Sequence, residues 1–173
     1  MMADLLGTPQ SPPGGTDGLA AVQPLALQSL LLGTYTPRLD AKGRVALPAK
    51  MRERLTDGLV MARGQERCIY LLPPAEFQRM VVRIQRNALG SRGSREYMRI
   101  FLSGAVEQEP DKQGRVLIPQ MLRDYARLGG DIVIIGVGTR AEIWDRQAWD
   151  GYLAANEQDY ADVANDVLEE LEL

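Results

Sequence analysis

Leu39-Asp40-Ala41-Lys42-Gly43-Arg44-Val45-Ala46-Leu47-Pro48 has a second copy 71 residues later, Pro110-Asp111-Lys112-Gln113-Gly114-Arg115-Val116-Leu117-Ile118-Pro119. The Asp, the Gly, the Arg, the Val after it and the final Pro are identical in the two stretches. Identities that all fall at one offset indicate an internal duplication. The sequence therefore predicts a fold built from two copies of one structural unit.

Each copy predicts a turn, a short strand and a short helix. In the turn, the carboxylate of Asp40 or Asp111 accepts backbone N–H bonds, and Gly43 or Gly114 tolerates a positive φ. The short apolar stretch after the arginine is typical of a strand. A proline then stands where a helix takes its first residue, and a glycine follows where the helix ends. The helices are expected over residues 49–55 and 120–128.

Composition excludes several kinds of site. The chain has 173 residues, of which 45% are hydrophobic, so it can bury a substantial core. It contains one cysteine and no histidine, which excludes a disulfide framework and argues against a zinc site or a Cys–His nucleophile. Cys68 lies in an apolar, strand-like run and is expected to be a buried, inert thiol. We expect neither a metal nor a cofactor.

The net charge of −3 conceals a strong division along the chain. Residues 33–144 hold 19 Lys or Arg against 12 Asp or Glu, whereas residues 145–173 hold one Arg against nine acidic residues. The repeat core is therefore basic and the C-terminal part acidic. A basic core suits a nucleic-acid partner. No apolar run has the length that a membrane span requires, so we expect no membrane partner and a location in the cytoplasm.

The segments outside the repeats also have distinct patterns. The N-terminal part is rich in Pro, Gly, Ser and Thr and is expected to be disordered. Between the repeats, Phe77, Met80, Val81 and Ile84 recur with the period of an amphipathic helix that begins after Pro74. Arginines recur along this linker. After Trp144, apolar stripes are expected on acidic helices. The predicted units are a disordered extension (1–31), repeat 1 (32–74), a helical Arg-rich linker (75–102), repeat 2 (103–146) and acidic C-terminal helices (147–173).

From about Leu32 to the C-terminus, the chain resembles the bacterial MraZ family. The resemblance rests on Gly33-Thr34-Tyr35-Thr36-Pro37-Arg38-Leu39-Asp40-Ala41-Lys42-Gly43-Arg44, on Leu47-Pro48-Ala49-Lys50, and on the second motif, 111–119. It implies two AbrB-type swapped-hairpin domains, each with an Asp-x-x-x-Arg signature. We therefore expect an α+β fold, mostly β, in which the repeats interlock as a pseudo-dimer in a double-psi-like β-barrel with peripheral helices. One copy has too few strands to close its own sheet, so pairing would cover its open edges.

The resemblance also implies a function. Proteins similar to this one assemble into ring-like homo-oligomers and bind short direct repeats in double-stranded promoter DNA. They repress their own operon, the division and cell-wall gene cluster. By this resemblance the chain is a nucleoid-associated, sequence-specific regulator. In such a ring, weak contacts to single DNA boxes would add up through multivalency.

The candidate DNA-binding residues lie in and beside the two turns. Arg44 and Arg115 stand where a guanidinium can reach a phosphate or a guanine edge. The plainer interpretation is that each arginine pairs with its own aspartate and only holds the turn, and the two roles are compatible. Flanking cations are candidates for phosphate contacts, and four turn residues are expected to be structural. The phosphate candidates are Arg38, Lys42 and Lys112, and the structural residues are Asp40, Gly43, Asp111 and Gly114.

Two other functional classes compete with DNA binding. An enzyme is not expected, because the chain has no histidine, a single cysteine and no paired carboxylates in a plausible cleft. A non-catalytic oligomeric scaffold or protein-interaction module is the stronger rival, because the acidic C-terminal helices with their apolar stripes can hold a partner. The Arg-rich linker can offer a second basic surface, although arginines spaced along a helix more often form its solvated face.

Overall fold

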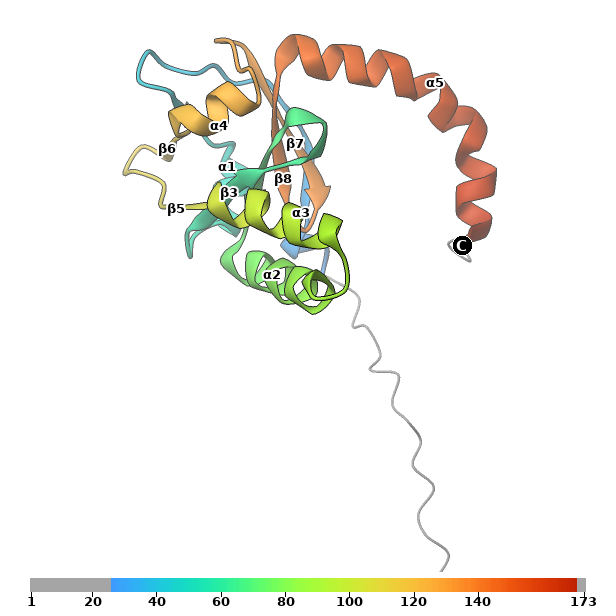
Figure 1. Ribbon diagram of the computed structural model, residues 1–173. Coiled ribbons are helices and arrows are strands. Elements are labelled where there is room, and N and C mark those ends of the chain that lie inside the picture. Colours follow the sequence, from blue (N-terminus) through green and yellow to red (C-terminus); the bar gives the residue numbers. More distant parts are fainter. Residues whose placement is uncertain (1–25, 171–173) are drawn as a thin grey trace, which may run out of the picture.

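The computed structural model describes residues 26–170 as an α+β fold with two antiparallel sheets (Figure 1). The strands are β1 (Leu31–Tyr35), β2 (Arg44–Ala46), β3 (Leu59–Arg63), β4 (Ile69–Leu72), β5 (Val106–Gln108), β6 (Arg115–Leu117), β7 (Ile132–Gly138) and β8 (Ala141–Asp145). The helices are α1 (Ala49–Arg54), α2 (Pro74–Ala88), α3 (Arg92–Ser103), α4 (Gln120–Tyr125) and α5 (Arg146–Glu170). Two short 3₁₀ turns, Leu27–Ser29 and Gln65–Arg67, complete the list.

The larger sheet has the strand order β1-β7-β8-β4-β3-β5. The equivalent strands of the two repeats are β1 and β5, β3 and β7, and β4 and β8. If each strand is replaced by its equivalent, the same order is read from the opposite edge of the sheet, so the sheet is symmetric in the two repeats. The first strand of each repeat pairs with the third strand of the other repeat, since β1 pairs with β7 and β5 with β3. At the centre of the sheet, β4 pairs with β8. Strand pairing between the repeats therefore occurs at three places in this sheet, and the two copies interlock.

The smaller sheet is made of the two motif strands, β2 and β6, and it packs on one face of the larger sheet. Val45 lies opposite Val116, and both side chains are buried. They join a core that includes Leu47, Ile118 and the inward side chains of the larger sheet. Because strand side chains alternate between faces, the other face carries a second set of buried residues. That second core holds Ala62, Cys68, Tyr70, Leu72, Phe101, Val133, Ile135 and Trp144.

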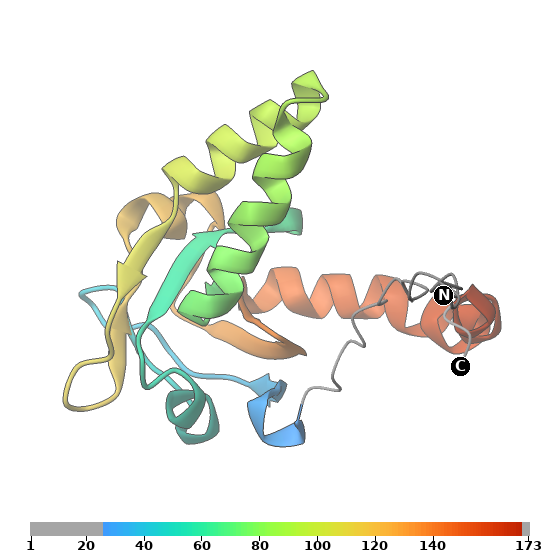
Figure 2. The same ribbon diagram turned by 90° about the horizontal axis from the view of Figure 1, so that it is seen from below.

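The second core is covered by α2, α3 and the start of α5 (Figure 2). As the sequence predicted, α2 begins at Pro74, and it packs Phe77, Met80 and Ile84 against this core. Cys68 lies in the same core, as expected for an inert thiol, and burial raises its pKa. Among the described residues, no helix is long and apolar enough to cross a membrane.

The expected closed barrel is not found in the described part of the chain. The two motif strands pair with each other as a separate ribbon and do not join the larger sheet. The outer edges of the larger sheet, formed by β1 and β5, consequently remain apart. The interlocked arrangement of two repeats is present, but it forms two open layers.

The ends of the described chain also differ from the expectations. Residues 26–31 belong to the extension that the sequence predicts to be disordered, yet Leu31 is 1% exposed and pairs with Gly138. Arg54 donates from Nε to the carbonyl of Gln28 at 2.7 Å, which ties this stretch to α1. The rest of the extension, residues 1–25, lies outside the described residues. At the other end, one continuous helix, α5, replaces the separate helices expected after Trp144.

Candidate nucleic-acid interface

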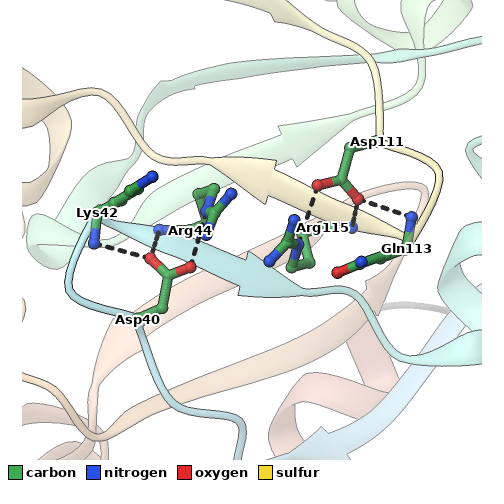
Figure 3. A network of polar contacts seen from close by, with 6 residues as sticks. All are labelled: Asp40, Lys42, Arg44, Asp111, Gln113 and Arg115. Atoms are coloured by element: carbon green, nitrogen blue, oxygen red, sulfur yellow. Dashed lines mark hydrogen bonds and ion pairs between the residues drawn. The ribbon is translucent and has the colours of Figure 1, made fainter.

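The two Asp-x-x-x-Arg turns lie side by side at the β2–β6 ribbon (Figure 3). Because β2 and β6 are antiparallel, Arg44 is opposite Leu117 and Ala46 is opposite Arg115. The pairing continues into the turns: the N–H of Leu47 donates to the carbonyl of Gly114 at 3.0 Å, and the N–H of Ile118 donates to the carbonyl of Gly43 at 2.9 Å. Each turn is thus fixed by the strand of the other repeat.

Within each turn, the aspartate organises the backbone and the arginine together. Asp40 Oδ1 accepts from the N–H groups of Lys42 and Arg44, both at 2.9 Å, and Asp40 Oδ2 accepts from Arg44 Nε at 2.7 Å. Asp111 Oδ1 accepts likewise from the N–H groups of Gln113 and Arg115, both at 2.9 Å. Its Oδ2 accepts from Arg115 Nε at 2.9 Å. The two turns therefore have the same hydrogen-bond pattern.

This hydrogen-bond pattern fixes the direction of each arginine side chain but leaves the terminal nitrogens of its guanidinium available for a ligand. In Arg44 and Arg115 only Nε bonds to the aspartate, and neither terminal nitrogen donates a hydrogen bond within residues 26–170. Both side chains are about one-third exposed, at 30%. A guanidinium held through Nε keeps its two terminal N–H groups for a bidentate contact to a phosphate or to guanine O6 and N7. The plainer role of the ion pair and the DNA-contact role are therefore compatible here.

The glycines permit this geometry. Gly43 has φ = 78° and Gly114 has φ = 73°, a left-handed conformation that favours glycine. A Cβ on Gly43 would meet the guanidinium of Arg123 in α4, and a Cβ on Gly114 would meet the side chain of Arg52 in α1. Each turn is therefore covered by an arginine from the helix of the other repeat.

Arg52 and Arg123 are not among the site residues predicted from the sequence. They are separated by the same 71 residues as the two motifs, so the repeat offset alone was a signal that identifies them. Arg52 is exposed, whereas Arg123 is partly buried and donates from Nη2 to Gln120 Oε1 at 2.7 Å. Together with the motif arginines they place four guanidinium groups around the ribbon.

The three predicted phosphate contacts are at the edge of this surface. Lys42 and Lys112 lie within the two turns and are exposed. Arg38 precedes the first turn, and its Nε contacts Asp131 Oδ1 at 3.1 Å, with 77% of the arginine side chain exposed. The structure thus brings the predicted cations to one region, and their DNA contacts stay a prediction.

The carboxylates of the two turns are held in their charged form. The pKa values of Asp40 and Asp111 are lowered, first by hydrogen bonds from the backbone N–H of Arg44 and Arg115, and further by the guanidinium groups. Both carboxylates have an ordinary value of 3.8. A group whose pKa is lower in the folded state contributes stability that is present above its unfolded value and is lost as the pH falls through its folded value.

We therefore expect the stabilising effect of Asp40 to depend on pH only in acid. Asp40→Asn removes the charged acceptor, so the variant should unfold at a lower temperature than the wild type at neutral pH. As the pH falls from the ordinary value of 3.8 through the lowered value of the folded state, the carboxyl is protonated first in the unfolded chain and then in the folded one, and the difference should shrink. Thermal unfolding of both proteins at a series of pH values between neutral and strongly acidic measures it. A difference that stays constant into strong acid would show that charge on Asp40 has no part in holding the turn.

Comparison with known proteins places this site in a family. The model of the family described as "MraZ protein, putative antitoxin-like" matches residues 30–99 and again residues 101–170. The chain belongs to the MraZ family. The two matches follow one another along the chain, in agreement with its internal duplication, and each contains one Asp-x-x-x-Arg turn.

Curated relatives named "Transcriptional regulator MraZ" align with most of the chain. The protein of Bifidobacterium longum (strain NCC 2705) is 66% identical over 146 residues, covering 84% of this chain and 97% of that protein. A relative from Micrococcus luteus is 53% identical over 139 residues, covering 80% of this chain and 97% of its own length. The Salinispora arenicola (strain CNS-205) protein is 52% identical over 139 residues, with 80% and 98% covered.

Proposed function

We propose that this protein is a sequence-specific, DNA-binding transcriptional regulator that uses the two Asp-x-x-x-Arg turns to contact double-stranded DNA. The observation that carries the proposal is the paired geometry of Arg44 and Arg115, each held through Nε with its terminal nitrogens available. The names of the relatives support the regulatory role. No catalytic role is assigned to any residue, and no cofactor is required.

The finer parts of the proposal rest on the family resemblance. We assign residues 32–74 and 103–146 to two AbrB-type units, with the linker 75–102 and the acidic part 147–173 outside them. The regulator binds short direct repeats upstream of its own operon, the division and cell-wall gene cluster, and represses it. It acts as a ring-like homo-oligomer at the nucleoid in the cytoplasm, so that several subunits contact successive DNA boxes.

Fluorescence anisotropy with the DNA upstream of the protein's own gene tests this function. Specific binding should exceed binding to a scrambled duplex of equal length by about 10³-fold or more. The affinity should also fall steeply with salt, because released counterions contribute to binding. Equal affinity for both duplexes would contradict sequence-specific regulation and favour the scaffold alternative.

The flanking cations are expected to act through charge alone. Replacing Lys42, Lys112 or Arg38 by alanine should weaken binding to the upstream and the scrambled duplex by the same factor. Each lost phosphate contact should reduce the slope of log affinity against log salt by about 0.9. Titrations of each variant across a salt series measure this slope. Arg92→Ala, which removes an arginine from α3 with an 87% exposed side chain, is the matched control and should leave the slope unchanged.

A further inference from the structure

The outward face of α2 combines exposed apolar side chains with unpaired arginines. Val82 is 45% exposed and Leu89, directly after the helix, is 91% exposed. Arginines flank them, and Arg83 and Arg86 make no ion pair within residues 26–170. We call this surface the α2 seam. It forms a shallow groove lined by Ala75, Gln78, Arg79, Val82, Arg83 and Arg86.

The α2 seam is not required for the fold of its own chain. The opposite face of α2 already packs Phe77, Met80 and Ile84 against the second core. Arg79 pairs with Glu76, so the only acidic residue of α2 neutralises one arginine and leaves the other two. An apolar pair flanked by uncompensated charge on a helix face is typical of a surface that meets another helix with the opposite charge.

The second half of α5 has the complementary properties. Leu153 is 39% exposed and Tyr160 is 78% exposed, and Glu157, Asp159 and Asp162 are exposed between and beside them. After Arg146, this helix contains no basic residue. Tyr152 packs on Trp144 and Trp149 at the start of this part of α5. All residues from 153 to 162 are exposed, so the surface that they form is not covered by its own chain.

The two surfaces also match in spacing. Val82 and Leu89 are seven residues apart, as are Leu153 and Tyr160, which is about two helical turns or roughly 10 Å along either helix. Residues seven apart lie on the same side of a helix. When the two helices lie alongside each other, both apolar pairs can meet while the arginines of α2 face the carboxylates of α5.

We propose that the acidic half of α5 docks on the α2 seam of a second copy of this chain. The occupant must be a second copy, because α5 extends away from the sheets and, although it bends along its length in Figure 1, stays apart from α2 in both views (Figures 1 and 2). The inference rests on the self-association in the proposed function and assigns its contact surfaces. It also gives a role to the opposite charges of the core and the C-terminal part.

Charge reversal tests this interface in the full chain. Arg83→Glu with Arg86→Glu makes the α2 seam acidic, and Glu157→Lys with Asp159→Lys makes α5 basic. Each double variant alone should self-associate at least about 10-fold more weakly than the wild type, because like charges then face each other. Sedimentation velocity over a range of protein concentrations and salt measures this. The chain with all four changes, or an equimolar mixture of the two double variants, should recover association.

The recovery separates a docking defect from a folding defect. A control double variant, Arg95→Glu with Arg99→Glu, makes the same charge change on α3 outside the groove and should associate like the wild type. The proposal is overturned if the wild type is monomeric, if either double variant assembles normally, or if the four changes together restore nothing. It is also overturned if the α2 variant stays assembled but loses DNA, because the seam would then be a DNA surface.

The two proposals can fail independently. If the dissociated α2 variant still binds a single DNA box and this binding still requires Arg44, the DNA-binding proposal stands whatever the assembly does. If charge reversal abolishes and restores assembly while the wild type shows no DNA preference, the docking inference stands and the regulatory function does not.

Discussion

Replacing Arg44 or Arg115 by alanine should weaken specific DNA binding by about 5- to 150-fold each, the equivalent of about 1–3 kcal/mol for one bidentate contact to a base. The two arginines belong to separate turns with their own aspartates. Their losses should therefore add, unless one DNA box engages both turns as a unit. Anisotropy titrations of the single and double variants against the upstream and scrambled duplexes measure both quantities.

The comparison with lysine separates base readout from charge. Arg44→Lys keeps the positive charge but lacks the planar fork that makes two parallel hydrogen bonds. It should retain binding to the scrambled duplex and lose most of the preference for the upstream duplex. If all alanine variants bind both duplexes like the wild type, the motif arginines only stabilise the turns. The arginines of the linker, or Arg52 and Arg123, would then be the candidates for DNA contact.

The turns of the site were predictable because their determinants are local. Asp40 and Gly43 are three residues apart, and their hydrogen bonds and positive φ follow from turn chemistry that a short sequence window contains. The start of α2 at Pro74 and its buried face followed from the helical period in the same way. The ion pairs of the turns, offered as one of two interpretations, are present as well.

The partners of these local units were not predictable from the same signals. Nothing in the sequence near Gly114 indicates that Arg52 of the other repeat covers it, because that contact depends on how the strands cross-pair. The open layers arise for the same reason, since β2 and β6 pair with each other and leave the larger sheet unclosed. The continuous α5 was not predicted because its apolar and acidic residues form no single clean stripe, although no Gly or Pro stop signal separates the two helices that were expected.

The largest expected effect on stability comes from Gly136. It lies in β7 opposite Gly33, and a Cβ at this position would overlap the backbone of Leu31 and Leu32 in β1. The sequence Gly136-Val137-Gly138 resembles part of a dinucleotide fingerprint, but the first glycine is explained by this close approach of two strands. Gly136→Ala should push β1 outward and expose Leu31, which is 1% exposed. We expect a loss of about 1–3 kcal/mol in the free energy of unfolding, as for an overpacked core.

Urea unfolding of Gly136→Ala and of a matched control, Gly151→Ala, measures this loss. A Cβ on Gly151 meets nothing within 4 Å, and this residue lies inside α5. Alanine is the better helix former by about 1 kcal/mol, so the control should be unchanged or slightly more stable. The difference between the two variants separates the effect of steric overlap at Gly136 from the general effect of replacing a glycine by alanine. If Gly136→Ala unfolds at the wild-type urea concentration, β1 tolerates displacement from β7. The first strand would then contribute little to holding the two repeats together, and the stability of the site would depend on the β2–β6 ribbon and on the β4–β8 pairing.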